Sequence, residues 1–196
     1  MSTKYILAGG YIQKVADGGK AFCEELVRGI EKNPVKILDC VFARPRDSWQ
    51  ETLERDKTLF STFISNFELE LAQPDTFTEQ VKNSDVIFLR GGFTKPLMEL
   101  LAKDPQWMKE LDGKVLAGTS AGADAIATYY AVLKTHRVGD GLGLLPIKFI
   151  PHWKSDYADE EVSDIDWDQE LEKLKAYKED LEIFTLHEGE FKVFIK

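Results

Sequence analysis

The stretch Val115-Leu116-Ala117-Gly118-Thr119-Ser120-Ala121-Gly122 joins an apolar run to the pattern Gly-x-Ser-x-Gly. The apolar run predicts a buried strand, and a glycine on each side of Ser120 allows the backbone to turn sharply into a helix. This spacing is typical of a nucleophile elbow, in which a tight turn presents the serine hydroxyl. Small residues also occur where a strand packs closely against a helix, so the pattern by itself fits either a nucleophile or close packing.

Five further β-rich runs, most of them nearly all apolar, predict strands, and segments with helical spacing lie between most of them. These strands are expected at Tyr5–Ala8, Val35–Phe42, Phe67–Leu71, Val86–Leu89 and Ile147–Ile150. Continuous apolar runs are typical of parallel strands that are covered on both faces. The alternation therefore predicts the α/β class, as a three-layer α/β/α fold around a doubly wound, mostly parallel sheet.

The C-terminal segment has a different pattern. Residues 166–178 carry apolar side chains on one helical face, and the runs Glu182–Leu186 and Phe191–Ile195 flank Glu188-Gly189. Two such runs around a glycine-containing turn predict a C-terminal β-hairpin at the sheet edge. No repeat, low-complexity tract or linker divides the chain, so residues 1–196 are expected to form a single domain.

The composition argues against several classes of function. The chain has 25 basic and 34 acidic residues, and a net charge of −9 argues against a nucleic-acid partner. It shows neither the apolar core of a signal peptide nor a run of membrane-spanning length, which predicts a soluble cytoplasmic protein with no membrane partner. Cys23 and Cys40 are too few for a disulfide framework and lack metal-ligand spacing, so we expect buried thiols and neither a metal nor an organic cofactor.

Loops that follow strands carry the ligand sites of open α/β sheets. The strand at 86–89 leads into Arg90-Gly91-Gly92-Phe93-Thr94, a glycine-rich loop beside the predicted serine turn. A nucleophilic serine needs backbone N–H groups that bind the oxyanion formed when it attacks a carbonyl. We expect the N–H of Ala121, directly after the serine, and those of Gly91 and Gly92 to be these donors.

The serine also needs a base, and the chain has three histidines. His152 follows the strand at 147–150 directly after a proline, which places it at the carboxyl end of a strand. His136 lies in a polar loop and His187 beside the predicted hairpin turn, where exposure to solvent is expected. We therefore predict that His152 is the base for Ser120.

Three blocks of this sequence together resemble the peptidase E family of serine peptidases. They are Leu89–Thr94, Gly118–Ala123, and Gly141–Pro146 leading to Pro151-His152. The family, which includes aspartyl dipeptidases, has a three-layer α/β fold like that of class I glutamine amidotransferases, and the likeness covers most of the chain. The resemblance implies a serine nucleophile at Ser120, a base at His152, and hydrolysis of a peptide bond in short peptides, with Asp-Xaa dipeptides among the expected substrates.

The sequence departs from the family pattern in the glycine-rich block, which usually reads Gly-Gly-Gly-Asn-Thr. Arg90 and Phe93 replace the first glycine and the asparagine, so contacts to the substrate are expected to differ. No arginine follows His152 closely, and Arg90 becomes the candidate for binding a substrate carboxylate, with Thr94 beside it in the substrate-binding loop.

The family's acidic triad residue lies between the serine and the histidine, where this chain offers only Asp124 and Asp140. We favour Asp140, in a Gly-Asp-Gly turn, over Asp124, directly after the elbow. The histidine could instead be oriented by Asp156, by a backbone carbonyl, or by no acid at all.

Two other functions share this scaffold. One is a catalytically inactive protein that binds a small ligand in the same pocket, and the other is an esterase or an amidase that acts on another small amide. A homodimer is compatible with the fold, although no residue in the sequence specifies one.

Overall fold

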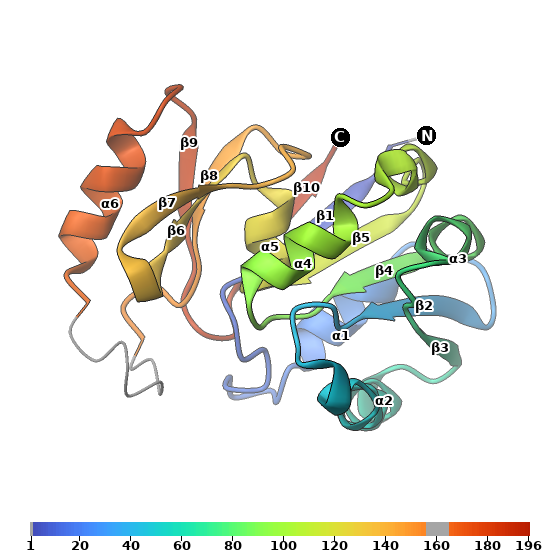
Figure 1. Ribbon diagram of the computed structural model, residues 1–196. Helices are drawn as coiled ribbons and strands as arrows, with labels where there is room; N and C mark the ends of the chain where they lie inside the picture. The colour runs from blue at the N-terminus through green and yellow to red at the C-terminus, as the bar shows by residue number, and fades with distance from the viewer. Residues whose placement is uncertain (1, 156–164) are drawn as a thin grey trace.

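The computed structural model describes residues 2–155 and 165–196 and contains two β-sheets flanked by helices (Figure 1). The elements, in chain order, are β1 (Lys4–Ala8), α1 (Lys20–Val27), β2 (Val35–Cys40), η1 (Arg46–Ser48), α2 (Trp49–Phe63), β3 (Phe67–Leu71), α3 (Phe77–Asn83), β4 (Val86–Leu89), α4 (Thr94–Leu101), η2 (Pro105–Glu110), β5 (Val115–Thr119), α5 (Ala121–Ile126), β6 (Tyr129–Val132), η3 (Leu133–Thr135), β7 (Arg137–Asp140), β8 (Ile147–Ile150), α6 (Trp167–Ala176), β9 (Glu182–Thr185) and β10 (Phe191–Ile195).

The larger sheet has the strand order β10-β1-β5-β4-β2-β3. Five of its strands are parallel to one another, namely β1, β5, β4, β2 and β3. Strand β10 runs antiparallel to β1 at one edge. Gly118 on β5 lies opposite both Leu7 on β1 and Leu89 on β4. The loops that follow these three strands therefore leave the sheet at the same edge.

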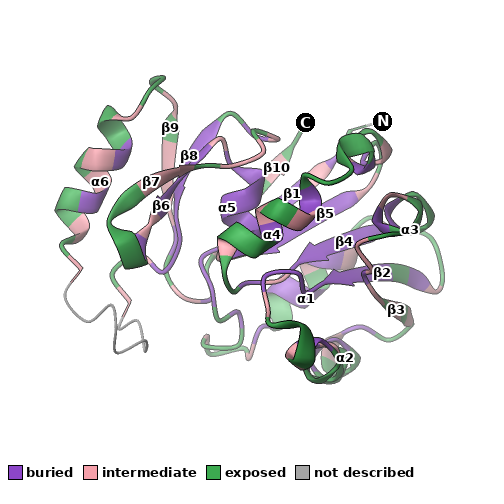
Figure 2. Cartoon of the chain, viewed as in Figure 1, coloured by how far each residue is buried: buried purple, intermediate pink, exposed green. Residues whose placement is uncertain are grey.

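Helices cover both faces of this sheet, which confirms the predicted α/β class and its three layers. Adjacent residues of β1 illustrate this: Leu7 belongs to a core cluster that includes residues of α3, α4 and α5, whereas Ile6 belongs to a separate cluster with residues of α1 and α2. Because both faces are covered, β4 and β5 are buried along their whole length, as Figure 2 shows. Their continuous apolar sequences follow from this burial.

A second sheet, of order β7-β6-β8-β9, was not expected from the sequence. The predicted strand Ile147–Ile150 is present as β8 and belongs to this sheet, where it is parallel to β6 and β9. Helix α6 packs on this sheet through Leu174, and α5 contacts strands of both sheets. The second sheet therefore lies beside the larger one across α5 (Figure 1).

The two C-terminal strands and the turn between them are present at the predicted positions. They extend different sheets, however: β9 pairs with β8, and β10 pairs with β1 at the edge of the larger sheet. The turn at Glu188-Gly189 thus connects the two sheets.

Two further findings concern the described residues. No helix among them is long and apolar enough to cross a bilayer. Cys23 and Cys40 are both buried free thiols, as predicted, and burial raises the pKa of Cys23 to about 12.

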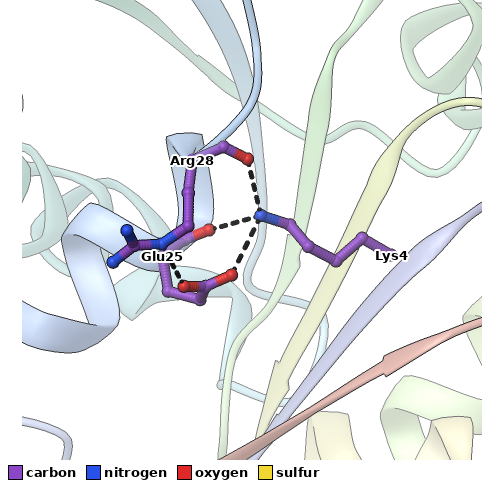
Figure 3. A network of polar contacts seen from close by, with 3 residues as sticks. All are labelled: Lys4, Glu25 and Arg28. Carbon is purple, nitrogen blue, oxygen red and sulfur yellow. Dashed lines mark hydrogen bonds and ion pairs between the residues drawn. The ribbon is translucent and has the colours of Figure 1, made fainter.

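Lys4 links the start of β1 to the end of α1 (Figure 3). Its Nζ donates to the backbone oxygens of Glu25 at 2.7 Å and Arg28 at 2.9 Å, and lies 3.2 Å from the Glu25 carboxylate. A cation at a helix C-terminus satisfies carbonyl groups that have no partner within the helix. The Lys4 side chain is only 14% exposed, so water does not readily replace it.

We expect Lys4→Met to lower the free energy of unfolding by about 2 kcal/mol, because it leaves a partly buried carboxylate and two carbonyls without this donor. Urea denaturation measures the change. Lys20→Met is the matched control, since the Lys20 side chain is 57% exposed and its ion pair with Glu24 spans 3.8 Å. The control should stay within about 0.5 kcal/mol of the parent protein. Equal losses in the two variants would show that the Lys4 contacts contribute nothing specific.

Candidate active site

Ser120 lies on a sharp turn between β5 and α5. Its backbone φ is 48° and ψ is −113°, a strained conformation with positive φ that L-residues rarely adopt and that is typical of a nucleophile elbow. A side chain at Gly118 would collide with the backbone of Gly122, and one at Gly122 would collide with the carbonyl group of Leu89. Both glycines are therefore required by close packing around the turn that presents Ser120.

His152 lies two residues beyond the end of β8 and reaches the edge of the larger sheet. Its backbone N–H donates to the oxygen of Gly9, after β1, over 2.9 Å. Its ring Nε2 lies 2.8 Å from Oγ of Ser120, and the residue is 4% exposed. The structure thus brings together the serine and the histidine that the sequence singled out.

Glu188, in the turn between β9 and β10, is the acidic partner of this histidine. Its Oε1 lies 2.7 Å from Nδ1 of His152 and accepts a hydrogen bond from the Ser155 hydroxyl over 3.0 Å. A carboxylate at Nδ1 favours the tautomer with the proton on that nitrogen, in which Nε2 is the acceptor for the hydroxyl proton of Ser120. The three side chains therefore form the hydrogen-bonded series Ser120, His152, Glu188.

The loop after β1 holds this series in place. The N–H of Gly189 donates to the oxygen of Gly10 over 2.8 Å, directly beside Glu188. A side chain at Gly10, whose φ is 140°, would collide with the His152 ring. The ring of Tyr11, the next residue, lies 5.7 Å from that of His152. Gly9-Gly10 thus allows the close approach of both the histidine and the turn that carries Glu188.

Asp140, predicted as the acid, does not take that place. It ends β7, where pairing with β6 directs it toward the end of α6, and its carboxylate accepts hydrogen bonds from Lys178 at 2.8 Å and Tyr177 at 3.3 Å. Its side chain is 56% exposed.

Asp124 does not serve as the acid either. It is buried in α5 and accepts a hydrogen bond from the Thr94 hydroxyl over 3.0 Å, and its burial raises its pKa well above the usual range. Thr94 thereby ties the start of α4 to α5. Asp156 lies outside the described residues.

Glu188 was missed because the sequence pattern marked it only as part of a hairpin turn. The available signal was indirect. The turn lies between the last two strands, and pairing of the last strand with β1 would place this turn beside the glycine-containing loops that follow the parallel strands. Strand β10 does pair with β1 in this way.

The predicted oxyanion donors differ in their surroundings. Ala121 is the first residue of α5, where an N–H has no partner within the helix. Gly91 lies against Ser120, but its N–H donates to the hydroxyl of Thr119 over 3.0 Å. Within the described ranges, no hydrogen bond to another protein atom uses the N–H of Ala121 or of Gly92. These two are therefore the available donors.

A cavity of about 1000 Å³ opens beside Ser120 and His152. Its lining includes Arg44, Arg55 and Arg90. Burial, together with the nearby Arg90 and Arg55, lowers the pKa of Arg44. Three guanidinium groups in one cavity create a site suited to an anionic group.

Aromatic side chains lie at the same cavity. Tyr11 and Phe93 line it and are 49% and 59% exposed, which leaves their rings accessible to a ligand. No group of three or more His, Cys, Asp or Glu side chains suited to a metal ion occurs among residues 2–155 and 165–196.

Comparisons with known proteins bear on the family and the fold of this chain. The model of peptidase family S51 matches residues 43–194. A peptidase from an acI-B1 Actinobacterium has a similar structure, with a TM-score of 0.72 at 21% identity, covering 99% of this chain and 84% of that one. A Listeria monocytogenes EGD-e protein, named as a candidate peptidase E, has a TM-score of 0.70 at 16% identity, covering 100% of this chain and 98% of that one.

A search of curated proteins finds no match to the chain. The structural likenesses show the fold, and the family match spans most of the sequence. The chain therefore belongs to peptidase family S51, the peptidase E family of serine peptidases.

Proposed function

We propose that this protein hydrolyses a peptide bond of short peptides, with Ser120 as nucleophile, His152 as general base and Glu188 as the acid that orients the histidine. The observation that carries this proposal is the hydrogen-bonded series of these three side chains beside the cavity, with 2.8 Å between Ser120 and His152 and 2.7 Å between His152 and Glu188. Such distances are those expected of a nucleophile, its base and the group that orients the base.

The reaction follows from this geometry. Oγ of Ser120 attacks the peptide carbonyl carbon while its proton moves to Nε2 of His152, and the N–H groups of Ala121 and Gly92 bind the resulting oxyanion. His152 then donates that proton to the departing amine nitrogen, the C–N bond breaks and an acyl ester of Ser120 remains. Water attacks the ester as His152 takes one of its protons, and return of that proton to Oγ releases the acid product. Glu188 stays ionised and stabilises the imidazolium.

The cavity favours a small substrate with an anionic group. Its volume of about 1000 Å³ lies at the upper end of the range for small-molecule sites. Arg44, Arg55 and Arg90 line it, and a guanidinium binds a carboxylate through two parallel hydrogen bonds. Asp-Xaa dipeptides are therefore the first substrates to test.

The test combines active-site labelling with a substrate panel. A fluorophosphonate probe should label the protein at Ser120, and a panel of Asp-Xaa, Glu-Xaa, Ala-Xaa and Lys-Xaa dipeptides should show the fastest turnover for the acidic members. Activated esters in the same panel test for an esterase. Absence of both labelling and hydrolysis would favour the binding protein, whereas turnover of esters alone would replace the peptidase by an esterase.

A further inference from the structure

Two buried carboxyl groups lie beneath Arg90 and take no part in the reaction described above. Asp39, near the end of β2, and Asp56, in the middle of α2, are both 0% exposed. The two carboxyl groups are neighbours, because Asp56 contributes to the raised pKa of Asp39 and Asp39 in turn influences the pKa of Asp56. Nη1 of Arg90 lies 3.2 Å from Oδ1 of Asp56 and forms an ion pair with it.

The four oxygens of this pair lack an ordinary donor. Among the described residues, no side-chain or backbone group donates a hydrogen bond to any of them in good geometry. Two ionised carboxylates cannot hydrogen-bond to each other, because neither has a proton to donate. A single proton between them supplies the missing donor and removes one of two adjacent buried negative charges.

The surroundings decide which group holds the proton. Burial and the neighbouring Asp56 raise the pKa of Asp39 well above its usual range. Burial also raises the pKa of Asp56, but Arg90 opposes this rise most strongly. The negative charge therefore belongs on Asp56, next to the guanidinium. The charged and titratable groups around the pair are Arg90 after β4, Arg44 after β2, Arg55 on α2, Cys23 on α1 and Cys40 on β2.

We propose that Asp39 and Asp56 are a positioning pair that shares one proton and fixes Arg90 at the wall of the cavity to bind the anionic group of the substrate. This inference rests on the proposed function, and it makes substrate binding depend on the protonation of residues that never touch the substrate.

The shared proton sets the charge of the site. With one proton on the pair, Asp56 balances Arg90, and Arg44 and Arg55 leave the cavity cationic. Nε of Arg44 and Nε of Arg90 are buried and have no acceptor among the described side chains and backbone. Loss of the proton adds a negative charge beneath Arg90 and weakens binding of an anion. KM for an acidic dipeptide should therefore rise at high pH.

The first experiment detects the proton without any substrate. A group whose native pKa is raised binds a proton that the unfolded chain has lost above about pH 4, so the free energy of unfolding falls as pH rises through this range. Each such proton lowers the folding equilibrium constant about tenfold per pH unit until the native group itself ionises. Asp124, also buried with a raised pKa, contributes one proton of this kind and serves as the calibration.

Urea denaturation of the parent protein, Asp39→Asn and Asp124→Asn is measured from pH 5 to pH 8. In each of these two variants, the folding equilibrium constant should fall less steeply with rising pH than in the parent. The difference should be about a factor of ten per pH unit, because each variant lacks one buried proton. Asp56→Asn leaves Asp39 buried, and burial is the largest cause of its raised pKa, so this variant should keep a pH dependence close to that of the parent. A pH dependence in Asp39→Asn equal to that of the parent would exclude the proton on this pair.

The second experiment tests the positioning of Arg90. Asp56→Asn removes the charge opposite Arg90 and should raise KM for an Asp-Xaa dipeptide about tenfold, with kcat and fluorophosphonate labelling of Ser120 retained. Arg90→Lys should raise KM similarly, because an ammonium lacks the fork of a guanidinium. In Asp39→Asn, which mimics the protonated partner, the rise of KM at high pH should disappear.

The outcomes separate the two proposals. An unchanged KM in both Asp56→Asn and Arg90→Lys would overturn the positioning role while leaving the serine mechanism intact. Failure of the parent protein to react with the fluorophosphonate would instead reject the proposed function, and the pH dependence of unfolding would still report on the shared proton.

Discussion

Replacing Ser120 with alanine should lower kcat for dipeptide hydrolysis by about 10⁴-fold or more and abolish labelling by a fluorophosphonate. The hydroxyl is the only group removed, and its partner is Nε2 of His152 at 2.8 Å. Alanine keeps the Cβ that already occupies the turn at φ 48°, so the backbone of the elbow meets no new clash. The loss of activity should therefore come without loss of fold, which circular dichroism and thermal denaturation measure.

A second serine provides the control for this variant. Ser61 lies exposed on α2, and its hydroxyl donates to the oxygen of Lys57 over 2.7 Å. Ser61→Ala should retain both labelling and turnover. Labelling of Ser120→Ala at the rate of the parent protein would show that another residue is the nucleophile.

The parts of the site that the sequence predicted correctly depend on local backbone chemistry. Around Ser120, glycines appear where the packing of β5, α5 and β4 leaves no room for a side chain, so the spacing itself carries the signal. The position of His152 follows from a buried apolar strand that ends at a proline. The same local reasoning predicted most strands of the larger sheet, since burial on both faces requires continuous apolar runs.

The parts that were missed depend on contacts between distant segments. The second sheet includes β6 and β7, and β7 ends at Asp140, within Gly139-Asp140-Gly141, which has the composition of a turn. A β-strand of four residues with two polar ends offers no clear pattern of alternation. Pairing with β6 then carries Asp140 to Lys178 and away from the histidine.

Glu188 was hidden for a related reason. Its role depends on β9 and β10 joining different sheets, so that the turn between them crosses the edge where the loop after β1 emerges. A sequence pattern that predicts two strands and a turn does not state which partners the strands choose. The same limit applies to Asp39 and Asp56, which lie 17 positions apart in the sequence and meet only when α2 packs on the sheet.

Glu188→Gln should lower kcat about 10³-fold with little change in KM. A glutamine amide fills the same volume, but it can present an N–H₂ group to Nδ1, and this favours the tautomer that places the proton on Nε2. A protonated Nε2 cannot accept the proton of Ser120, and a neutral amide does not stabilise the imidazolium. Steady-state kinetics on one dipeptide measure the loss, and Glu188→Asp should lie between the parent protein and Glu188→Gln because the carboxylate is kept at shorter reach.

Asp140→Asn is the matched control that decides between the two acids. Asp140 is 56% exposed and pairs with Lys178 at 2.8 Å, so its neutralisation should change stability by less than about 1 kcal/mol and leave kcat within about twofold. If Asp140→Asn lost activity while Glu188→Gln kept it, the acid would lie where the sequence order alone had suggested, and the loop that carries Glu188 would have to leave His152 during turnover. The 2.7 Å contact between Glu188 and Nδ1, together with the Ser155 hydroxyl bound to the same oxygen, makes the opposite result the expected one.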